Sequence, residues 1–258
     1  MVKQISTYIT EKLKLNKDSS VKYKYHPKDK DELREIVDEC LNTRGVNADL
    51  NDIDLSGITD MSSLFYRLDP WKIDISNWNV SNVTNMSNMF NSCRSFNCDL
   101  SNWDVSKVKN MKGIFYYCTK FNSDLSKWDV SNVEDMRSMF YNCENFNCDL
   151  SKWQVFNAIE LSAMFGGCMN FTSDLSAWDV SSAEYMVSMF AGCKKFNSDL
   201  SKWDVSNVVN MMRMFASCNK FDSDLSRWDV SNVSNMYDMF FECDSLKKRP
   251  AWYNEPDM

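Results

Sequence analysis

The sequence predicts an α/β repeat solenoid of about eight 25-residue units with a cap at each end. Tryptophan recurs every 25 residues, at positions 78, 103, 128, 153, 178, 203 and 228. Cysteine follows with the same period, from Cys93 to Cys243, and no insertion interrupts the spacing. A fixed period of this size is typical of solenoids, in which each unit buries its apolar face only against its neighbours.

The unit that begins at Trp103 shows which element each part of the repeat predicts. Trp103 and Val105 alternate with a polar residue, which predicts a short strand with one face inward. Ser106 can then cap a helix, because its hydroxyl can accept a free backbone N–H. Apolar residues follow at helical spacing. They are Val108, Met111, Phe115 and Cys118. Each unit should therefore pair one strand with one short helix, and Leu125 should anchor the return to the next Trp.

Residues 1–47 differ from the repeats and predict an N-terminal α/β cap. Residues 4–13 carry apolar side chains at helical spacing, and residues 21–25 alternate apolar and basic side chains like a strand. A second helix should begin after Asp29, with Glu32 placed for a capping box, and end near Gly45. Its buried face should carry one apolar set. The set is Leu33, Ile36, Val37, Cys40 and Leu41. A right-handed β-α-β unit with the first repeat strand is plausible.

The solenoid itself should span residues 48–245, after an imperfect first unit in which Ile53 takes the Trp position. Residues 246–258 should form a C-terminal cap. There the period breaks at Pro250, which cannot donate to a ladder. Trp252 and Tyr253 should fold back as a small aromatic lid. Such caps are needed because an open terminal edge invites aggregation.

Two regular columns of side chains have both a structural and a functional interpretation. The seven cysteines at the repeat position should point the same way, which is poor geometry for bridging. We favour buried, reduced thiols over disulfides. An Asp also precedes each Trp by four residues, from Asp74 to Asp224. It should accept backbone N–H groups within its turn. The alternative is an acidic ligand or a calcium ladder, which needs several oxygens converging on one ion.

Composition and motifs exclude several classes of function. The net charge of −7 disfavours nucleic-acid binding. No apolar run is long enough to span a bilayer, and no secretory or lipidation signal is visible, so we expect a cytoplasmic chain unless a leader has been removed. One histidine and no CxxC pair leave no zinc site. We find no catalytic triad, glycine-rich phosphate loop or metal cluster, and expect neither an enzyme nor a bound cofactor.

The repeat resembles the short repeats of bacterial surface lipoproteins of unknown function, relatives of BspA-like leucine-rich repeats. Good copies of the motif are residues 139–147 and 199–208, and the match covers roughly four fifths of the chain. The resemblance implies a leucine-rich-repeat-like fold, with a parallel sheet on one side and short helices on the other. It also implies an adhesion or interaction role, often at the cell surface, and offers no catalytic residues.

A partner should bind where outward positions depart from the repeat pattern. The outward face of the predicted helices is polar in the first regular unit and becomes apolar from the fourth unit onward. We predict a protein interface formed by the exceptions. They are Phe156, Ile159, Met169, Tyr185, Val187, Val209, Met212, Tyr237 and Phe241. An exposed apolar patch of this extent suggests an interface. Sequence drift in these units and coverage by the C-terminal tail remain the alternatives.

These observations predict a non-catalytic protein-interaction scaffold, whose partner could be another protein or a second copy of the chain. A surface adhesin that binds host protein or glycan is one alternative. A phage- or virus-encoded binder or inhibitor of a cellular protein is another. A leader peptide or oxidised cysteines would favour the adhesin. The partner itself is not identified by any motif.

Overall fold

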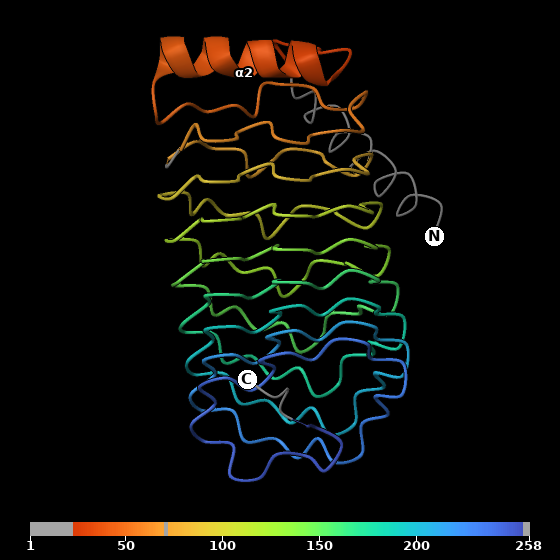
Figure 1. The fold of residues 1–258 in the computed structure, drawn as a ribbon. Helices are drawn as coiled ribbons and strands as arrows, with labels where there is room; N and C mark the ends of the chain where they lie inside the picture. Colours follow the sequence, from red (N-terminus) through yellow and green to blue (C-terminus); the bar gives the residue numbers. More distant parts are fainter. Residues whose placement is uncertain (1–22, 70–71, 255–258) are drawn as a thin grey trace, which may run out of the picture.

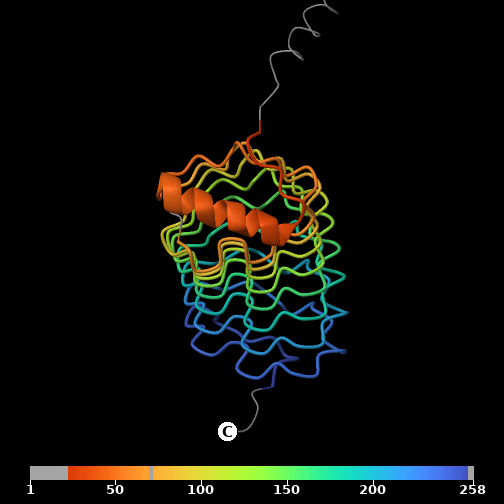
Figure 2. The same cartoon turned by 90° about the horizontal axis from the view of Figure 1, so that it is seen from above.

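The structure is a computed structural model that describes residues 23–69 and 72–254. Eight coils of 25 residues are stacked on one another, and one helix lies across the N-terminal end of the stack (Figures 1 and 2). This helix, α2 (Lys30–Arg44), is the only helix within the described residues. The predicted helix at residues 4–13 lies outside them.

Helix α2 confirms the prediction for this segment. The Asp29 side chain accepts the N–H of Glu32, and Glu32 in turn accepts the N–H of Lys28. Gly45 ends the helix with φ 77°, and its N–H donates to the Leu41 carbonyl. Of the predicted apolar face, three residues are fully buried and two are partly buried against the core. The expected strand before α2 is reduced to a single parallel bridge between Tyr25 and Ile53.

The predicted α/β solenoid, with a leucine-rich-repeat-like parallel sheet on one side and short helices on the other, is wrong. Among the described residues the coils contain no helix and no strand longer than an isolated bridge. Parallel bridges join one residue of each coil to the next. They run through Asp60, Asn85, Asn110, Asp135, Glu160, Tyr185, Asn210 and Asn235. A chain of tight turns occupies the place of each expected helix.

The turns follow from the backbone of residues 86–93 and their equivalents, which we call the turn segment. Two of its positions have positive φ in every coil, for example Asn88 (56°) and Ser92 (65°). An α-helix cannot contain such residues, since all its residues have negative φ. Alternate N–H groups also donate to the next coil, as Met86 does to Asn110 at 2.9 Å. The apolar spacing is therefore that of successive turns.

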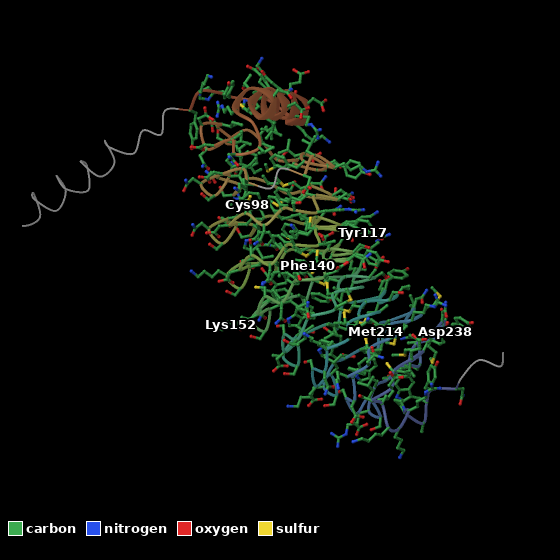
Figure 3. All side chains as sticks on the ribbon, turned by 90° about the vertical axis from the view of Figure 1, so that its left-hand side faces the viewer. Cys98, Tyr117, Phe140, Lys152, Met214 and Asp238 are labelled. Atoms are coloured by element: carbon green, nitrogen blue, oxygen red, sulfur yellow. The ribbon has the colours of Figure 1, made fainter. Side chains whose placement is uncertain are left out.

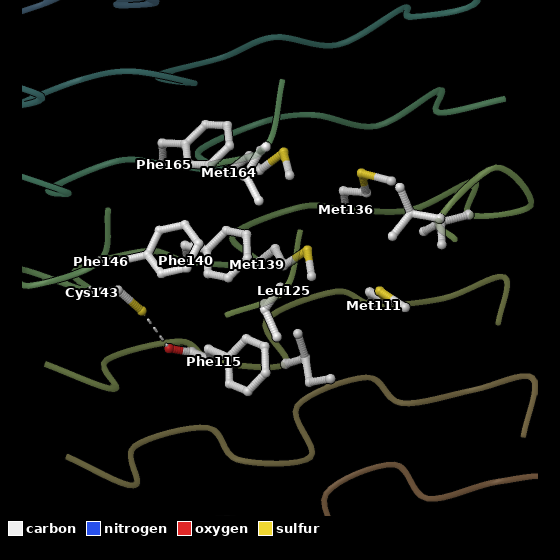
Figure 4. Close-up of a cluster of buried hydrophobic side chains, with 14 of the residues drawn as sticks. Met111, Phe115, Leu125, Met136, Met139, Phe140, Cys143, Phe146, Met164 and Phe165 are labelled. Carbon is white, nitrogen blue, oxygen red and sulfur yellow. Dashed lines mark hydrogen bonds between the residues drawn. The ribbon is translucent and has the colours of Figure 1, made fainter. Parts of the chain in front are cut away.

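Side-chain hydrogen bonds join the coils where the sheet was expected. The indole Nε1 of Trp103 donates to the Ile75 carbonyl at 3.1 Å, and Trp128 repeats this contact with Leu100 at 3.0 Å. Cysteine does the same beside the turn segment, because Cys143 Sγ donates to the Phe115 carbonyl at 3.0 Å (Figure 4). Both residue types are thus selected by the need for a buried donor at each coil boundary.

The core is a set of aromatic columns that run the length of the stack. Phe115 and Phe140 are stacked with ring centroids 5.7 Å apart, and Phe140 meets Phe146 of its own coil at 4.0 Å (Figure 4). Trp103 and Trp128 stack at 6.5 Å. Offset aromatic pairs at these separations contribute beyond the area they bury. The regular residues of the repeat therefore stabilise the stack and leave function to outward positions.

Candidate functional site

Two opposite sides of the stack carry the outward side chains. Figure 3 shows Tyr117 and Asp238 on one side and Cys98 and Lys152 on the other. The side with Tyr117 and Asp238 belongs to the turn segments and holds part of the predicted interface. The side with Cys98 and Lys152 carries the regular Asp column. The two sides differ in what their residues bond to, and we describe each in turn.

The Asp column serves the turns, which confirms its structural interpretation. Asp149 Oδ1 accepts the N–H of Ser151 at 2.9 Å, and the other members of the column accept from the Ser two residues on. These bonds to the backbone and hydroxyl of Ser151 lower the pKa of Asp149, because they favour its charged form. Within residues 23–69 and 72–254, no group of acidic, His and Cys side chains could hold a metal ion.

All ten cysteines are free in the structure. Burial raises the pKa of the Cys93 thiol to about 12, and burial raises that of Cys143 well above its ordinary value. A thiolate is the reactive form, so these thiols are poor nucleophiles. Their role is to pack as small apolar groups and to donate S–H to a carbonyl, as Cys118 does to Phe90.

Five of the nine predicted interface residues are among the most exposed large apolar side chains of the described chain. Tyr237 and Phe241 are each 51% exposed. Phe156, Ile159 and Tyr185 are also exposed. The remaining four are partly buried. They are Met169, Val187, Val209 and Met212. Each exception to the repeat therefore keeps solvent-accessible surface.

The structure brings only some of these residues together. Val187 and Phe241 line a groove of about 560 Å³ on the turn-segment side, which we call the axial groove because it crosses successive coils. Ile159 lines a different hollow with Glu134 and Glu184. The predicted helix would have placed these positions on one face. Because the segment is a chain of turns, they are separated around the edge of the coil.

Small residues shape the axial groove, and the prediction missed them. Gly167, Ala191 and Ala216 line it between two rings, Tyr141 at one end and Phe241 at the other. Arg137 and Arg213 also line it, and Arg213 is paired with Asp238 at 2.9 Å. The signal in the sequence was a run of Gly and Ala at positions that carry Tyr in earlier coils. It identifies a depression only when the coils are known to be stacked.

Comparison with known proteins gives a family and no activity. A family model described as "Mycoplasma protein of unknown function, DUF285" matches residues 32–153 and 136–252. The chain belongs to this family. No curated protein and no solved structure matches it. For this DUF285 member, the two overlapping matches cover α2 from Glu32 onward and all eight coils. Within the described residues, no helix has the length and apolar character needed to cross a membrane.

Proposed function

We propose that this DUF285 member is a non-catalytic scaffold that binds a protein partner on the side of the axial groove. The observation that carries the proposal is a change along two columns of the turn segment. One column reads Ser87, Lys112, Arg137, Ser162 and then Val187, Met212, Tyr237. The other ends Gly166, Ala191, Ala216, Phe241. Both become apolar toward the C-terminal end.

The apolar change leaves the backbone bonds of the stack unaltered, which is why we assign it to a partner. Positions 87 and 187 are equivalent, and the coils that contain them make the same bonds to their neighbours. Val187 and Phe241 remain accessible at the groove. A solvent-exposed apolar surface of this kind is commonly an interaction site. This is also the role that a likeness to BspA-like proteins implies.

Paired charge substitutions test the proposal. Val187→Asp with Met212→Asp places two carboxylates on the apolar part of the column. The matched control, Ser87→Asp with Lys112→Asp, places them at equivalent positions of two early coils. A photo-crosslinking residue at position 187, with position 87 as reference, would identify the partner in cells. The partner would then be purified for calorimetric titration.

We expect the Val187/Met212 variant to bind the purified partner at least tenfold more weakly, which is about 1.4 kcal/mol. The control variant should bind like the unaltered chain. Equal crosslinking at positions 87 and 187, or equal affinities for both variants, would contradict the proposal. Sedimentation velocity distinguishes a second copy of the chain from another protein, because only self-association would depend on the concentration of this chain alone.

A further inference from the structure

Within the turn segments, the backbone hydrogen bonds between coils all run in one direction. Met211, Arg213, Phe215 and Ser217 donate their N–H groups to carbonyls of the last coil, at 2.7 to 3.0 Å. The carbonyls belong to Asn235, Tyr237, Met239 and Phe241. The same alternation is present in the earlier coils, for example from Met86 to Asn110. The turn segment therefore presents N–H donors toward the C-terminal end of the stack and carbonyl acceptors toward the N-terminal end.

The last coil presents this donor row without a further coil to accept it. The four donors are the N–H groups of Met236, Asp238, Phe240 and Glu242. The Tyr253 hydroxyl lies beside the Phe240 N–H. Among the described residues, the other three donate to no backbone carbonyl. A backbone N–H that lacks an acceptor binds one readily, since an unmade hydrogen bond costs free energy once solvent is excluded.

Trp252 and Tyr253 fold back over this end as the predicted aromatic lid, which covers only part of it. Trp252 stacks on Trp228 at 6.4 Å, and its Nε1 donates to the Leu225 carbonyl. It thus takes the place that the next Trp of the column would have. Tyr253 packs edge-on against Phe240. Tyr237 and Phe241, on the turn segment beside the free donors, remain half exposed.

A second copy of the chain does not offer the matching acceptors. Two C-terminal edges would bring donors against donors. The acceptor edge at the opposite end is covered by α2, where Arg34 Nη1 donates to the carbonyls of Ser63 and Leu64 at 3.2 and 2.6 Å. The last coil also carries the carboxylates of Asp238, Glu242 and Asp244, and their negative charge disfavours a phosphate-bearing ligand. Neutral amide carbonyls of another protein fit this edge best.

We propose that the C-terminal edge of the eighth coil docks an extended segment of a partner protein, which adds to the stack through its backbone carbonyls. Strand addition of this kind uses main-chain bonds for affinity and side-chain pockets for specificity. This inference rests on the proposed scaffold function and specifies how a protein partner can bind to it. It also continues the axial groove, because Phe241 lines the groove and belongs to the donor edge.

The structure also indicates which residue the segment should carry opposite Phe241. Tyr141 occupies the position equivalent to Phe241 four coils earlier, and its ring lies against Gly166 of the following coil. A Cβ atom at Gly166 would be 2.9 Å from Tyr141 Cδ2. In the preceding coil the neighbour of such a ring is a second, stacked ring instead of a glycine: the ring centroids of Tyr116 and Tyr141 are 5.1 Å apart. We therefore expect glycine, or an aromatic residue able to stack, at that place in the docking segment.

The test uses the full chain and a synthetic peptide with the sequence of residues 157–168, carrying Cys168→Ser. This peptide copies the segment that follows Tyr141 in the stack. We expect saturable binding by fluorescence anisotropy and slower amide exchange within residues 234–243. Phe241→Ala should weaken binding at least tenfold. Tyr66→Ala, the matched change at the same position of the first coil, should leave it unaltered. A peptide with Gly166→Leu should bind at least tenfold more weakly.

Absence of saturable binding overturns the proposal, as does equal weakening by Tyr66→Ala or protection that appears outside residues 234–243. The Val187→Asp/Met212→Asp variant separates this proposal from the proposed function. It should still bind the peptide, because neither substitution touches the donor edge. Loss of partner binding with peptide binding retained is the expected result. Loss of both would count against the edge alone, and retention of both would count against the groove alone.

Discussion

The ring of Tyr141 lies over Gly166 of the next coil, so close that a Cβ atom on Gly166 would be 2.9 Å from Tyr141 Cδ2. Tyr141 in turn stacks on Tyr116 of the preceding coil, with planes 12° apart. The aromatic side chains of this column therefore lean toward the C-terminal end. The column changes from Tyr to Gly at this point, and the axial groove begins there.

Substitution of Gly166 by Ala tests this contact. We expect Gly166→Ala to lower the free energy of unfolding by about 1–3 kcal/mol, since the added methyl group must displace the Tyr141 ring from its stack. Urea unfolding followed by tryptophan fluorescence measures the change. The backbone at Gly166 has no positive φ, so an alanine is not otherwise strained there.

The Tyr141→Ala background supplies the control for this contact. With the ring absent, Gly166→Ala should be neutral or stabilising by about 0.4–1 kcal/mol, because alanine restricts the unfolded chain. A double-mutant cycle gives the coupling between the two sites. If Gly166→Ala cost the same free energy in both backgrounds, the Tyr141 ring would not be its cause.

The cysteine column predicts slow thiol chemistry in the folded protein. At pH 8, a thiol reagent should modify at most the half-buried Cys98 and Cys243, and these slowly, because burial raises the pKa of each to about 11. All ten should react in denaturant. Rapid modification of Cys118 or Cys143 in the native state would contradict the buried column.

The same thiols predict alkaline instability. Their folded pKa values lie above the unfolded value of about 8.5, so the stabilisation is complete below that pH. It is lost as the pH rises through the folded values, about 11 for Cys98 and about 12 for Cys93. The free energy of unfolding, measured by urea titration of the reduced protein, should therefore be lower at pH 10 than at pH 7.

The repeat period allowed the core to be predicted, but not the conformation of each unit. Met111, Phe115 and Cys118 are buried as expected. A helix and a chain of tight turns can bury the same three positions, so apolar spacing alone does not distinguish them. What decides is φ, and residues such as Ser138 (54°) and Arg213 (55°) show no preference that reveals it. The bonds to neighbouring coils impose that backbone.

In the candidate site, the sequence likewise predicted which residues are exposed, whereas their proximity depends on how the coils stack. Val187 and Phe241 were predicted as outward exceptions, and both line the axial groove. Gly192 and Ala216 were missed, because the predicted interface consisted of large apolar side chains. Small side chains contribute to the groove by leaving space between their neighbours. Ile159 was grouped with Val187 on one helical face that does not exist. Exposure was thus predictable from each residue, whereas proximity needed the path of the chain.

Arg34 predicts how firmly α2 is held on the acceptor edge. Arg34→Ala removes a guanidinium that donates to the carbonyls of Ser63 and Leu64. We expect a loss of about 1–3 kcal/mol in the local stability of α2, because bonds from a charged donor are strong and the Leu64 carbonyl is left unpaired. Amide exchange should accelerate in residues 30–44 and 61–67. Coils far from α2 should be unaffected, since each contacts only its neighbours.

Glu35→Ala, on the exposed side of α2, is the matched control for Arg34→Ala. It removes a neighbouring charged side chain without touching the first coil, and exchange within residues 61–67 should stay slow. Faster exchange throughout the stack in Arg34→Ala would mean that the eight coils unfold as one cooperative unit. Unchanged exchange in residues 30–44 would mean that Arg34 does not hold α2 in place.

The Asp column predicts loss of stability in acid. Asp99, Asp149 and Asp174 each accept a backbone N–H from the Ser two residues on, which lowers the pKa of each carboxyl group. A lowered folded pKa stabilises the fold above the unfolded value of about 3.9, and this stabilisation is lost as the pH falls through the folded value. The thermal midpoint should therefore fall steeply below about pH 4. Asp149→Asn cannot ionise, so this variant should have a lower thermal midpoint at pH 7 and a weaker dependence of the midpoint on acid pH. If a variant with several such Asp→Asn changes kept the full dependence on acid pH, acid unfolding would be due to other groups.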